Sequence, residues 1–321
     1  MKHLYIGGYG DGILTAGAGL TPAPAPSFLA AHPALPVLYA VGELAEGVLL
    51  SFSTAGGVPA GTGRRPSGGD SPCHLAVHPS GALLAVANYG DGVVTLHRLD
   101  GEGRFTGEPI SLPHTGSGPR PDRQRGPHAH QCVFHGDVLH VPDLGTDEIR
   151  RYTLTGEPLE PVRLAPGMGP RHLVFSGERV YVAGELDGTL RAYAAGDWRE
   201  LFRVKASGAD GVTYPSHVDV SGGRVYLLNR GPDTIAVFSA DGDPLAEVDS
   251  GGAWPRHFAI DGGTLWVANQ NSASVAVFTL AGGVPGATGE IIEVKSPACV
   301  LPVQAKPYAR GRAPGDDGRL C

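Results

Sequence analysis

Charged side chains that could bind an anion and move a proton stand at related places in this sequence, each directly after a proline. Arg171 and Arg256 lie in Pro-Arg-His triplets, and His128 follows Pro127 in the same way. Arginine binds carboxylate or phosphate through its planar fork, and histidine transfers protons near neutral pH. This arrangement points to chemistry on a small anionic molecule.

Two glutamates and a further arginine come at the ends of apolar runs. Glu43, Glu185 and Arg230 each follow the residue that ends such a run. A carboxylate is a candidate general base toward water, and a neighbouring arginine can hold an anion or stabilise an oxyanion. No GxSxG sequence occurs, so a serine nucleophile is disfavoured.

The surroundings of these residues recur because one pattern returns about every 40 to 55 residues, the spacing of β-propeller blades. Each copy has a proline, a short apolar strand, a glycine turn and a second apolar strand, and most copies add a third strand of alternating polarity. A two-sheet sandwich also has short strands, but regular copies of this length argue against it. Complete copies begin at Pro26, Pro72, Pro127, Pro170, Pro215 and Pro255.

The two ends of the sequence supply a seventh copy between them. The stretch around Pro297 matches only the first strand, and residues 3–10 match only the second. A blade built from both ends pairs the last open sheet edges and closes the ring. We therefore expect an all-β, seven-bladed β-propeller over residues 1–303, with its last blade closed by both termini, and a flexible C-terminal tail over residues 304–321.

Comparison of the copies separates scaffold from candidate site. The residue that ends the second strand is Gly, Asn or Asp in every copy, which is turn chemistry, and a histidine recurs two residues after four of the prolines. These histidines, expected to be structural, are His74, His172, His217 and His257.

Two other positions keep their place in the repeat but change their residue. They are the position after the opening proline and the position after the second-strand turn. In a propeller both lie near the axis on one face, so we expect them to surround one pocket. Their charged members are His128, Arg171, Arg230, Arg256, Glu43 and Glu185.

Arg120, Arg123 and Arg125 precede the third copy and could help to bind a phosphate. Their proline-rich surroundings favour a solvated connection instead.

The composition restricts the partners. A formal net charge of -7 offers no general attraction to nucleic acid or to an anionic membrane. No apolar run approaches the ~20 residues that cross a bilayer, and the first residues lack the apolar core and cleavage site of a signal peptide. We expect a cytoplasmic monomer or weak homo-oligomer without nucleic-acid or membrane partners.

Metal sites and disulfides are not expected. The 13 histidines form no HExxH or similar cluster. The cysteines are scattered without a CxxC pair, so they are expected to be free thiols. They are Cys73, Cys132, Cys299 and Cys321.

The chain resembles the lactonase family of seven-bladed β-propellers, which includes bacterial 6-phosphogluconolactonases of that fold and fungal carboxy-cis,cis-muconate cyclases. The resemblance runs through essentially the whole chain before the tail. It is most specific in PHAHQ, PDLGTD, GPRH, GEL, NRG and PRHF. It implies a site of a histidine, arginines and a glutamate, which by motif are His128, Arg171, Arg256 and Glu185.

The resemblance implies hydrolysis of a sugar lactone, most specifically 6-phosphogluconolactone, without metal or cofactor. Opening this internal ester needs an activated water, a partner for the oxyanion and a proton for the departing ring oxygen. We assign Glu185 as general base and His128 as proton donor. Arg171 and Arg256 are expected to bind the anion, with one facing the oxyanion. Further substrate contacts are expected from Arg230, Glu43, His130, Asp143, Asn269 and Gln270.

Two other functions fit the same residues. A cycloisomerase or lyase acting on a carboxymuconate-like diacid would use the arginines for two carboxylates. A non-catalytic propeller that binds a ligand or a protein is the other, since one fold serves many roles. An assay of lactone hydrolysis against carboxymuconate cyclisation separates them.

Overall fold

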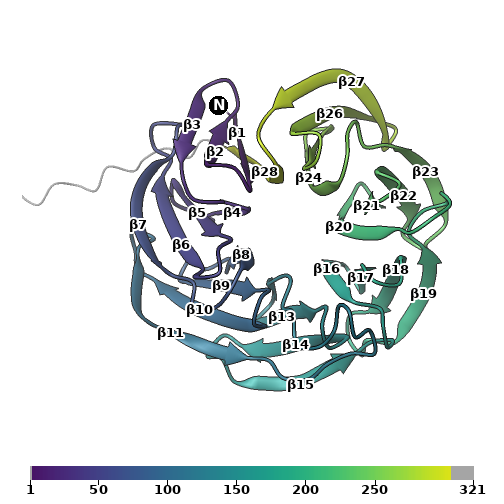
Figure 1. Cartoon of the computed structure of the whole chain (residues 1–321), viewed down its shortest axis with the longest axis horizontal. Coiled ribbons are helices and arrows are strands. Elements are labelled where there is room, and N and C mark those ends of the chain that lie inside the picture. Colours follow the sequence, from purple (N-terminus) through teal and green to yellow (C-terminus); the bar gives the residue numbers. More distant parts are fainter. Residues whose placement is uncertain (1, 305–321) are drawn as a thin grey trace, which may run out of the picture.

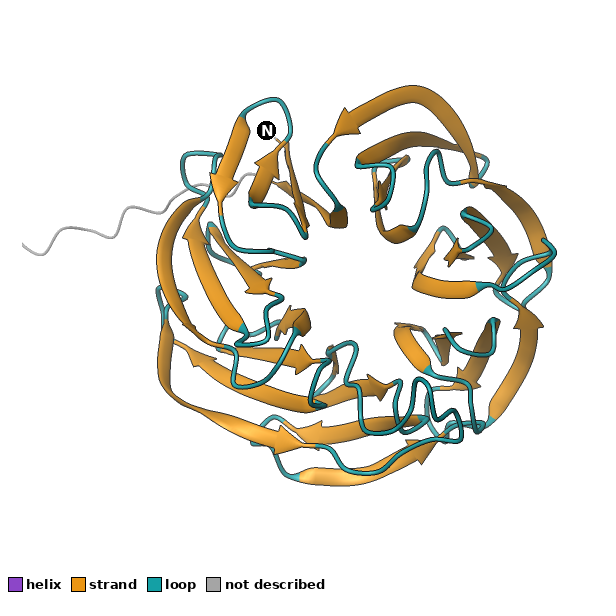
Figure 2. Cartoon of the chain, viewed as in Figure 1, coloured by secondary structure: helices purple, strands orange, loops and turns teal. Residues whose placement is uncertain are grey.

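The computed structural model describes residues 2–304, and every regular element within them is a β-strand (Figure 2). The strands form seven four-stranded antiparallel sheets around a central axis (Figure 1). This confirms the predicted seven-bladed β-propeller. Residues 2–304 contain no helix long and apolar enough to cross a membrane.

Six blades are built from four consecutive strands that run outward from the axis. The first three of these blades are β4 (Phe28–Ala31), β5 (Val37–Gly42), β6 (Val48–Ser53) and β7 (Ala60–Pro66); β8 (Pro72–Val77), β9 (Leu83–Asn88), β10 (Val93–Leu99) and β11 (Phe105–Pro113); β12 (Val133–His135), β13 (Val138–Asp143), β14 (Glu148–Thr153) and β15 (Pro158–Arg163). The next three are β16 (Pro170–Ser176), β17 (Arg179–Gly184), β18 (Thr189–Ala194) and β19 (Glu200–Lys205); β20 (Tyr214–Ser221), β21 (Arg224–Arg230), β22 (Thr234–Ser239) and β23 (Pro244–Asp249); β24 (Pro255–Asp261), β25 (Thr264–Asn269), β26 (Ser274–Ala281) and β27 (Val284–Glu293).

Burial explains why the strands differ in sequence pattern. The second strand of a blade is covered on both faces by the neighbouring blades, so it reads as a continuous apolar run; β17 (RVYVAG) is buried at every residue but its first. The outermost strand has an open edge and alternates between exposed and half-buried positions, as in β19 (ELFRVK), which has no fully buried residue.

The seventh blade joins the two ends of the described chain. Its strands are β28 (Pro297–Gln304), β1 (Lys2–Gly8), β2 (Gly12–Thr15) and β3 (Gly19–Pro22), in that order from the axis. β1 pairs with β28 from Lys2 opposite Gln304 to Gly8 opposite Pro297, which confirms closure by both ends. The expected tail lies outside the described residues, apart from Gln304.

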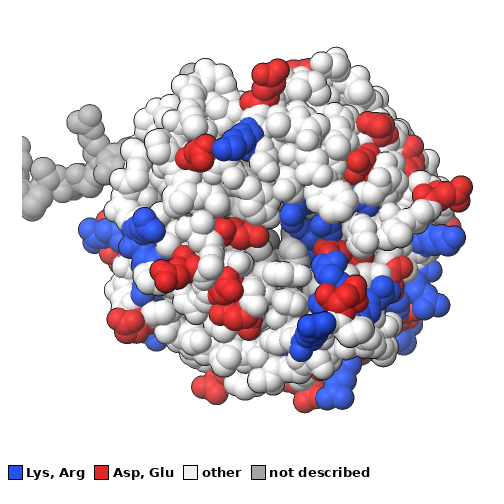
Figure 3. Space-filling view, in the orientation of Figure 1, with Lys and Arg blue, Asp and Glu red and all other residues white. Residues whose placement is uncertain are grey.

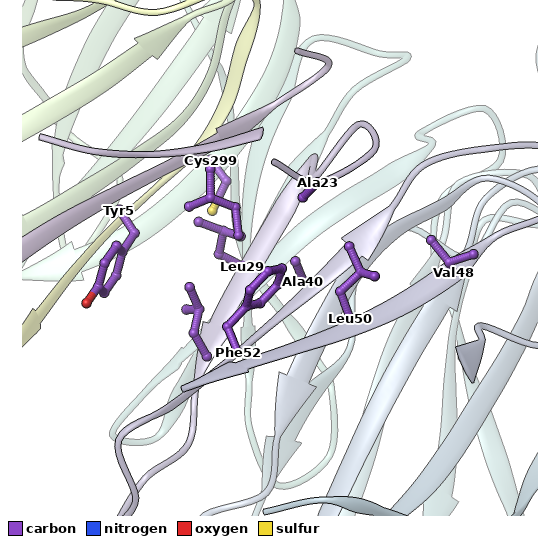
Figure 4. Packing of buried hydrophobic residues seen from close by; sticks show 10 residues of the cluster. Tyr5, Ala23, Leu29, Ala40, Val48, Leu50, Phe52 and Cys299 are labelled. Atoms are coloured by element: carbon purple, nitrogen blue, oxygen red, sulfur yellow. The ribbon is translucent and has the colours of Figure 1, made fainter. Parts of the chain in front are cut away.

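The core consists of apolar clusters between adjacent blades. Figure 4 shows one, where Tyr5 and Cys299 of the closing blade pack against Leu29 and Phe52 of the next. Such contacts bury each sheet on both faces and hold the inner strands at a fixed distance from the axis. Cys73, Cys132 and Cys299 are free thiols, as expected, and Cys321 lies outside the described residues.

Candidate active site

A backbone hydrogen bond ties together the two variable positions of most blades. The residue before the opening proline exposes its carbonyl to the N–H of the residue after the second strand; Glu185 N donates to Gly169 O at 2.9 Å, and Glu43 N to Ala25 O at 3.0 Å. The residue before the proline adopts a left-handed backbone to do so. Its φ lies between 41° and 62° at Ala25, Ser71, Gly169, Trp254 and Ser296.

Glycine is required at one of these positions. A Cβ on Gly169, where φ is +58°, would lie 2.3 Å from Cγ of Leu186. The turn that carries Glu185 can therefore pack tightly only over a glycine.

A β-bulge directs the residue after the proline. Pro170 pairs with Gly184 and His172 with Ala183, so Arg171 is left out of the ladder. The same shift leaves Arg256 unpaired between Pro255 and His257. Bulges bend the strand and re-aim side chains. The repeated proline thus begins a local structure that turns the next side chain toward the axis.

These positions surround a cavity of about 230 Å³ at the axis. In Figure 3, acidic and basic side chains lie around a hollow at the centre of this face. The cavity brings together six of the ten predicted site residues. They are Glu43, His130, Arg171, Glu185, Arg230 and Arg256.

Glu185 is held by three arginines. Its Oε1 accepts a hydrogen bond from Arg123 Nη2 at 2.7 Å, and its Oε2 accepts one from Arg230 Nη2 at 2.6 Å and lies 3.1 Å from Arg171 Nε. Burial alone would raise the pKa of Glu185, but Arg230 and Arg171, with further contributions from His130 and Arg123, hold it well below its usual range. Glu185 is therefore a fixed negative charge.

These contacts argue against the expected role of Glu185 as general base. Both carboxylate oxygens of Glu185 already accept hydrogen bonds from arginines. Because its pKa is so low, this carboxylate accepts protons poorly near neutral pH. The arginines are in turn secured, since Arg171 Nη1 donates to Ser216 O and Arg230 Nε to Tyr214 O. Glu185 serves to hold guanidinium groups side by side.

The opposite part of the cavity has a different arrangement. Arg256 Nε donates to Gln270 Oε1 at 2.6 Å, and its guanidinium lies 5.2 Å from the ring centre of Tyr9. Tyr9 Oη donates to Glu43 Oε1 at 3.3 Å. Gln270 does not line the cavity, so it orients Arg256 rather than contacting a ligand there.

The two histidines predicted for the site lie in different places. His128 does not line the cavity; its ring stacks on Tyr89 at 4.4 Å, and its Nδ1 lies 2.8 Å from Tyr89 O. His130 lines the cavity instead. The reason is a local shift of register by two residues. Ala129, not Pro127, pairs with Asp143, and Leu144 N donates to His128 O, so His130 stands where Arg171 stands in its own blade.

Asp143 and Asn269 are also outside the cavity, and both are fully buried. Asp143 Oδ2 lies 2.6 Å from His114 Nδ1, and its Oδ1 accepts the backbone N–H of His128. Asn269 exchanges hydrogen bonds with Ser250. Their polar atoms are used in these contacts, which support the turns where the second strands end.

The four recurrent histidines pack around the axis as neutral rings. His172 and His217 face each other with Nδ1 atoms 2.8 Å apart, so one of the two donates a proton to the other. His217 also lies against His257, with ring centres 4.2 Å apart, and His172 lies edge-on to His74. Burial lowers the pKa of all four, to about 3 for His257. They pack against one another around the axis, and His172 also lines the cavity.

Arg123 belongs to the site although the sequence favoured a solvated loop there. It lies between β11 and β12, and its side chain is about one-third exposed while its guanidinium reaches Glu185. The available signal was its position in an arginine-rich segment before PHAHQ. Tyr9 and Tyr89, both at variable positions, also line the cavity.

The chain was compared with known proteins. The family model "Lactonase, 7-bladed beta-propeller" matches residues 10–302. The chain is 35% identical over 189 residues to a 6-phosphogluconolactonase of Bacillus subtilis (strain 168), and 32% identical over 191 residues to a 6-phosphogluconolactonase of Formosa agariphila. Each alignment covers 54% of this chain and 54% of the relative, so the chain spans about half the length of the curated relatives it matches.

Solved structures are similar over nearly the whole chain. A putative 6-phosphogluconolactonase from Bacteroides fragilis has a TM-score of 0.85 at 25% identity, covering 94% of this chain and 98% of that one. The periplasmic gluconolactonase of Pseudomonas aeruginosa has a TM-score of 0.85 at 26% identity, covering 95% and 99%. Because the family model matches residues 10–302, the chain belongs to the lactonase family of seven-bladed β-propellers.

Proposed function

We propose that this chain hydrolyses a sugar lactone, and that its substrate is the phosphorylated lactone 6-phosphogluconolactone. Membership of the lactonase family supports the reaction, and the names of two curated relatives support the substrate. We propose further that it acts without metal or cofactor, as a cytoplasmic monomer or weak homo-oligomer. One solved relative is named as periplasmic, so cell fractionation is the test of location.

The charge of the cavity carries the substrate proposal. Four arginines and two glutamates line it, a formal charge of +2 in a chain whose net charge is -7. A phosphate monoester carries a charge of about -1.5 to -2 at neutral pH and three acceptor oxygens. Arg123, Arg171 and Arg230 surround one carboxylate, so this cluster retains a surplus of positive charge that suits the phosphate.

With the phosphate beside these three arginines, the lactone ring would lie on the other side of the cavity, next to Arg256. Arg256 forms no ion pair within residues 2–304, and its guanidinium is half-buried beside Tyr9. We assign it to the lactone carbonyl, where its charge would stabilise the oxyanion formed when water attacks. His130 and Tyr89 border the cavity and would contact the sugar.

The test is an assay of the purified chain with freshly prepared 6-phosphogluconolactone, unphosphorylated gluconolactone and carboxymuconate, with the spontaneous reaction subtracted. We expect rapid opening of the phosphorylated lactone and a kcat/KM for the unphosphorylated lactone at least about tenfold lower, the loss of one charge-assisted contact or more. Cyclisation of carboxymuconate without lactone opening would favour the diacid reaction. Binding without turnover would favour a non-catalytic propeller.

A further inference from the structure

Two carboxylates line the cavity, and their surroundings suit them to different tasks. Glu185 contacts three guanidinium groups and is nearly fully buried. Glu43 is half-buried, and within residues 2–304 no lysine or arginine lies at ion-pair distance from it. Tyr9 Oη donates a hydrogen bond to its Oε1 at 3.3 Å, and the Ser27 hydroxyl lies close by. Glu43 therefore has carboxylate lone pairs that a water molecule in the cavity can meet.

We propose that Glu43, and not Glu185, is the catalytic residue that takes the proton from the attacking water. This inference rests on the lactone hydrolysis proposed above, and it assigns Glu185 to holding the arginines.

The position of Glu43 is fixed by its backbone. It follows β5, and its N–H donates to Ala25 O at 3.0 Å, the same tie that positions Glu185 in its own blade. The closing blade lies next to it and supplies Tyr9, over which Arg256 is stacked. Carboxylate, phenol and guanidinium thus form a connected row along one wall, with Arg256 proposed for the oxyanion and Glu43 for the water.

The electrostatic surroundings favour proton transfer at this carboxylate. Burial raises the pKa of Glu43, and the hydroxyl of Ser27, the guanidinium of Arg256, Tyr9 and Arg171 offset only part of this effect. A carboxylate with a raised pKa accepts a proton more readily and is a better general base near neutral pH.

The other titratable groups around Glu43 are poorly suited to the task. Burial raises the pKa of both Tyr9 and Cys73, so each remains protonated and cannot accept a proton. Burial, reinforced by Arg171, lowers the pKa of His130 well below its ordinary value, so imidazolium is disfavoured there.

The proposed reaction balances without any further reactant. A lone pair of the water oxygen forms a bond to the lactone carbonyl carbon while a water proton passes to Glu43, and the carbonyl π pair moves to the oxygen beside Arg256. The intermediate then collapses: a lone pair of the oxyanion re-forms the carbonyl π bond, the bond from that carbon to the ring oxygen breaks, and its electron pair goes to the ring oxygen. That oxygen takes the proton from Glu43, giving a hydroxyl and regenerating the carboxylate. The new carboxylic acid releases its own proton to solvent.

The experiment compares Glu43→Gln with the wild type on 6-phosphogluconolactone across pH 4 to 8. We expect kcat to fall about 10²–10⁴-fold, the usual contribution of general acid–base catalysis, with KM changed less than about threefold. In the wild type, the acidic limb of the kcat profile should have its midpoint above the ordinary pKa of a glutamate. This limb should vanish in Glu43→Gln.

Two further variants make the result specific. Glu46→Gln changes an exposed carboxylate three residues along the same loop and should behave as wild type. Glu185→Gln should retain the acidic limb. Retention of wild-type kcat by Glu43→Gln, or loss of the acidic limb in Glu185→Gln alone, overturns the inference while leaving lactone hydrolysis intact. If the wild-type chain opens no lactone, both the proposed function and this inference are wrong.

Discussion

Arg230 Nη2 lies 2.6 Å from Glu185 Oε2, although the two residues belong to neighbouring blades and are 45 positions apart. Both side chains are about 95% buried, so removal of either charge would leave the other buried without its partner, which costs free energy of folding. Arg171 and Arg123 approach the same carboxylate. One negative charge therefore allows three positive groups to stand within reach of a single ligand.

Replacement of Glu185 by Gln should destabilise the free protein and increase its response to anions. The three guanidinium groups would repel one another without the carboxylate, and removal of one partner from a buried ion pair costs about 3–5 kcal/mol. Added inorganic phosphate would supply the missing charge. Thermal melting with and without phosphate should show a lower Tm for Glu185→Gln and a larger rise on adding phosphate.

The control for this prediction is Glu290→Gln, which removes an exposed carboxylate far along the chain and should leave both melting curves unchanged. A Glu185→Gln protein with wild-type Tm and wild-type phosphate response would mean that the arginines do not depend on this carboxylate.

Arg123→Ala should weaken binding of the phosphorylated substrate and leave the rate of the chemical step nearly unchanged. Its guanidinium is the most exposed of the three around Glu185, and it comes from a connection rather than a blade. A hydrogen bond to a charged group contributes about 1.5–3 kcal/mol, so KM for 6-phosphogluconolactone should rise about 10- to 100-fold with kcat nearly constant. Steady-state kinetics on the phosphorylated and unphosphorylated lactones measures the difference.

Arg125→Ala is the matched variant, because Arg125 is exposed on the same loop and its Nε donates to Pro121 O. It should leave both substrates unaffected. Equal losses on the two lactones in Arg123→Ala would place its contact away from the phosphate.

Removal of residues 2–8 should prevent stable folding. The deletion removes β1, which pairs with β28 on one side and β2 on the other, and it takes away the fully buried Tyr5 and Ile6. Those two side chains alone contribute about 3–6 kcal/mol of burial, against a typical total stability of 5–15 kcal/mol. Circular dichroism and size-exclusion chromatography should show loss of cooperative melting and aggregation through the open edges.

A synthetic peptide of residues 1–10, added during refolding, should restore a cooperative transition, and a scrambled peptide should not. A deleted chain that melts like the wild type would show that closure by β1 is dispensable.

The repeat made the fold and much of the site predictable. Seven copies of one pattern give seven blades, and Pro297 with residues 3–10 gives the closure, because each copy must bury the same faces and open edges must pair. The variable positions reach the cavity through a bulge and a backbone hydrogen bond that recur with the proline, so Arg171, Arg256 and Glu185 could be selected without a structure.

What departed from the repeat was not predictable. Arg123 lies in a connection that has no counterpart in other blades, so comparison of the copies gives it no position. His130 replaces His128 because the register of this blade is shifted by two residues, with Ala129 instead of Pro127 opposite Asp143. The low basicity of Glu185 depends on how many guanidinium groups surround it, which is a property of three-dimensional contacts.

The buried histidines should make the fold labile to mild acid. Seven of them have a folded-state pKa below the ordinary value of 6.5, so below pH 6.5 the unfolded chain binds protons that the folded chain does not; they are His74, His97, His130, His140, His172, His217 and His257. Stability is thus fully present above pH 6.5 and is lost as pH falls toward the folded pKa, which is about 3 for His257 and about 4 for His97 and His140. Glu43 and Asp219, whose pKa values burial raises, act weakly in the opposite sense.

Urea unfolding at half-unit steps from pH 8 to pH 5 tests this prediction above the range where most carboxylates titrate. The free energy of unfolding should be nearly flat above pH 7 and should fall below pH 6.5, each buried histidine adding at most about 1.4 kcal/mol per pH unit. His257→Gln, whose amide oxygen can still accept the N–H of Val300, should lower this slope by up to that amount, whereas replacement of the half-buried His78 by Gln should not. If stability is independent of pH between 7 and 5, the rings around the axis are protonated in the folded protein, and their packing must be stabilised by something other than neutral imidazole contacts.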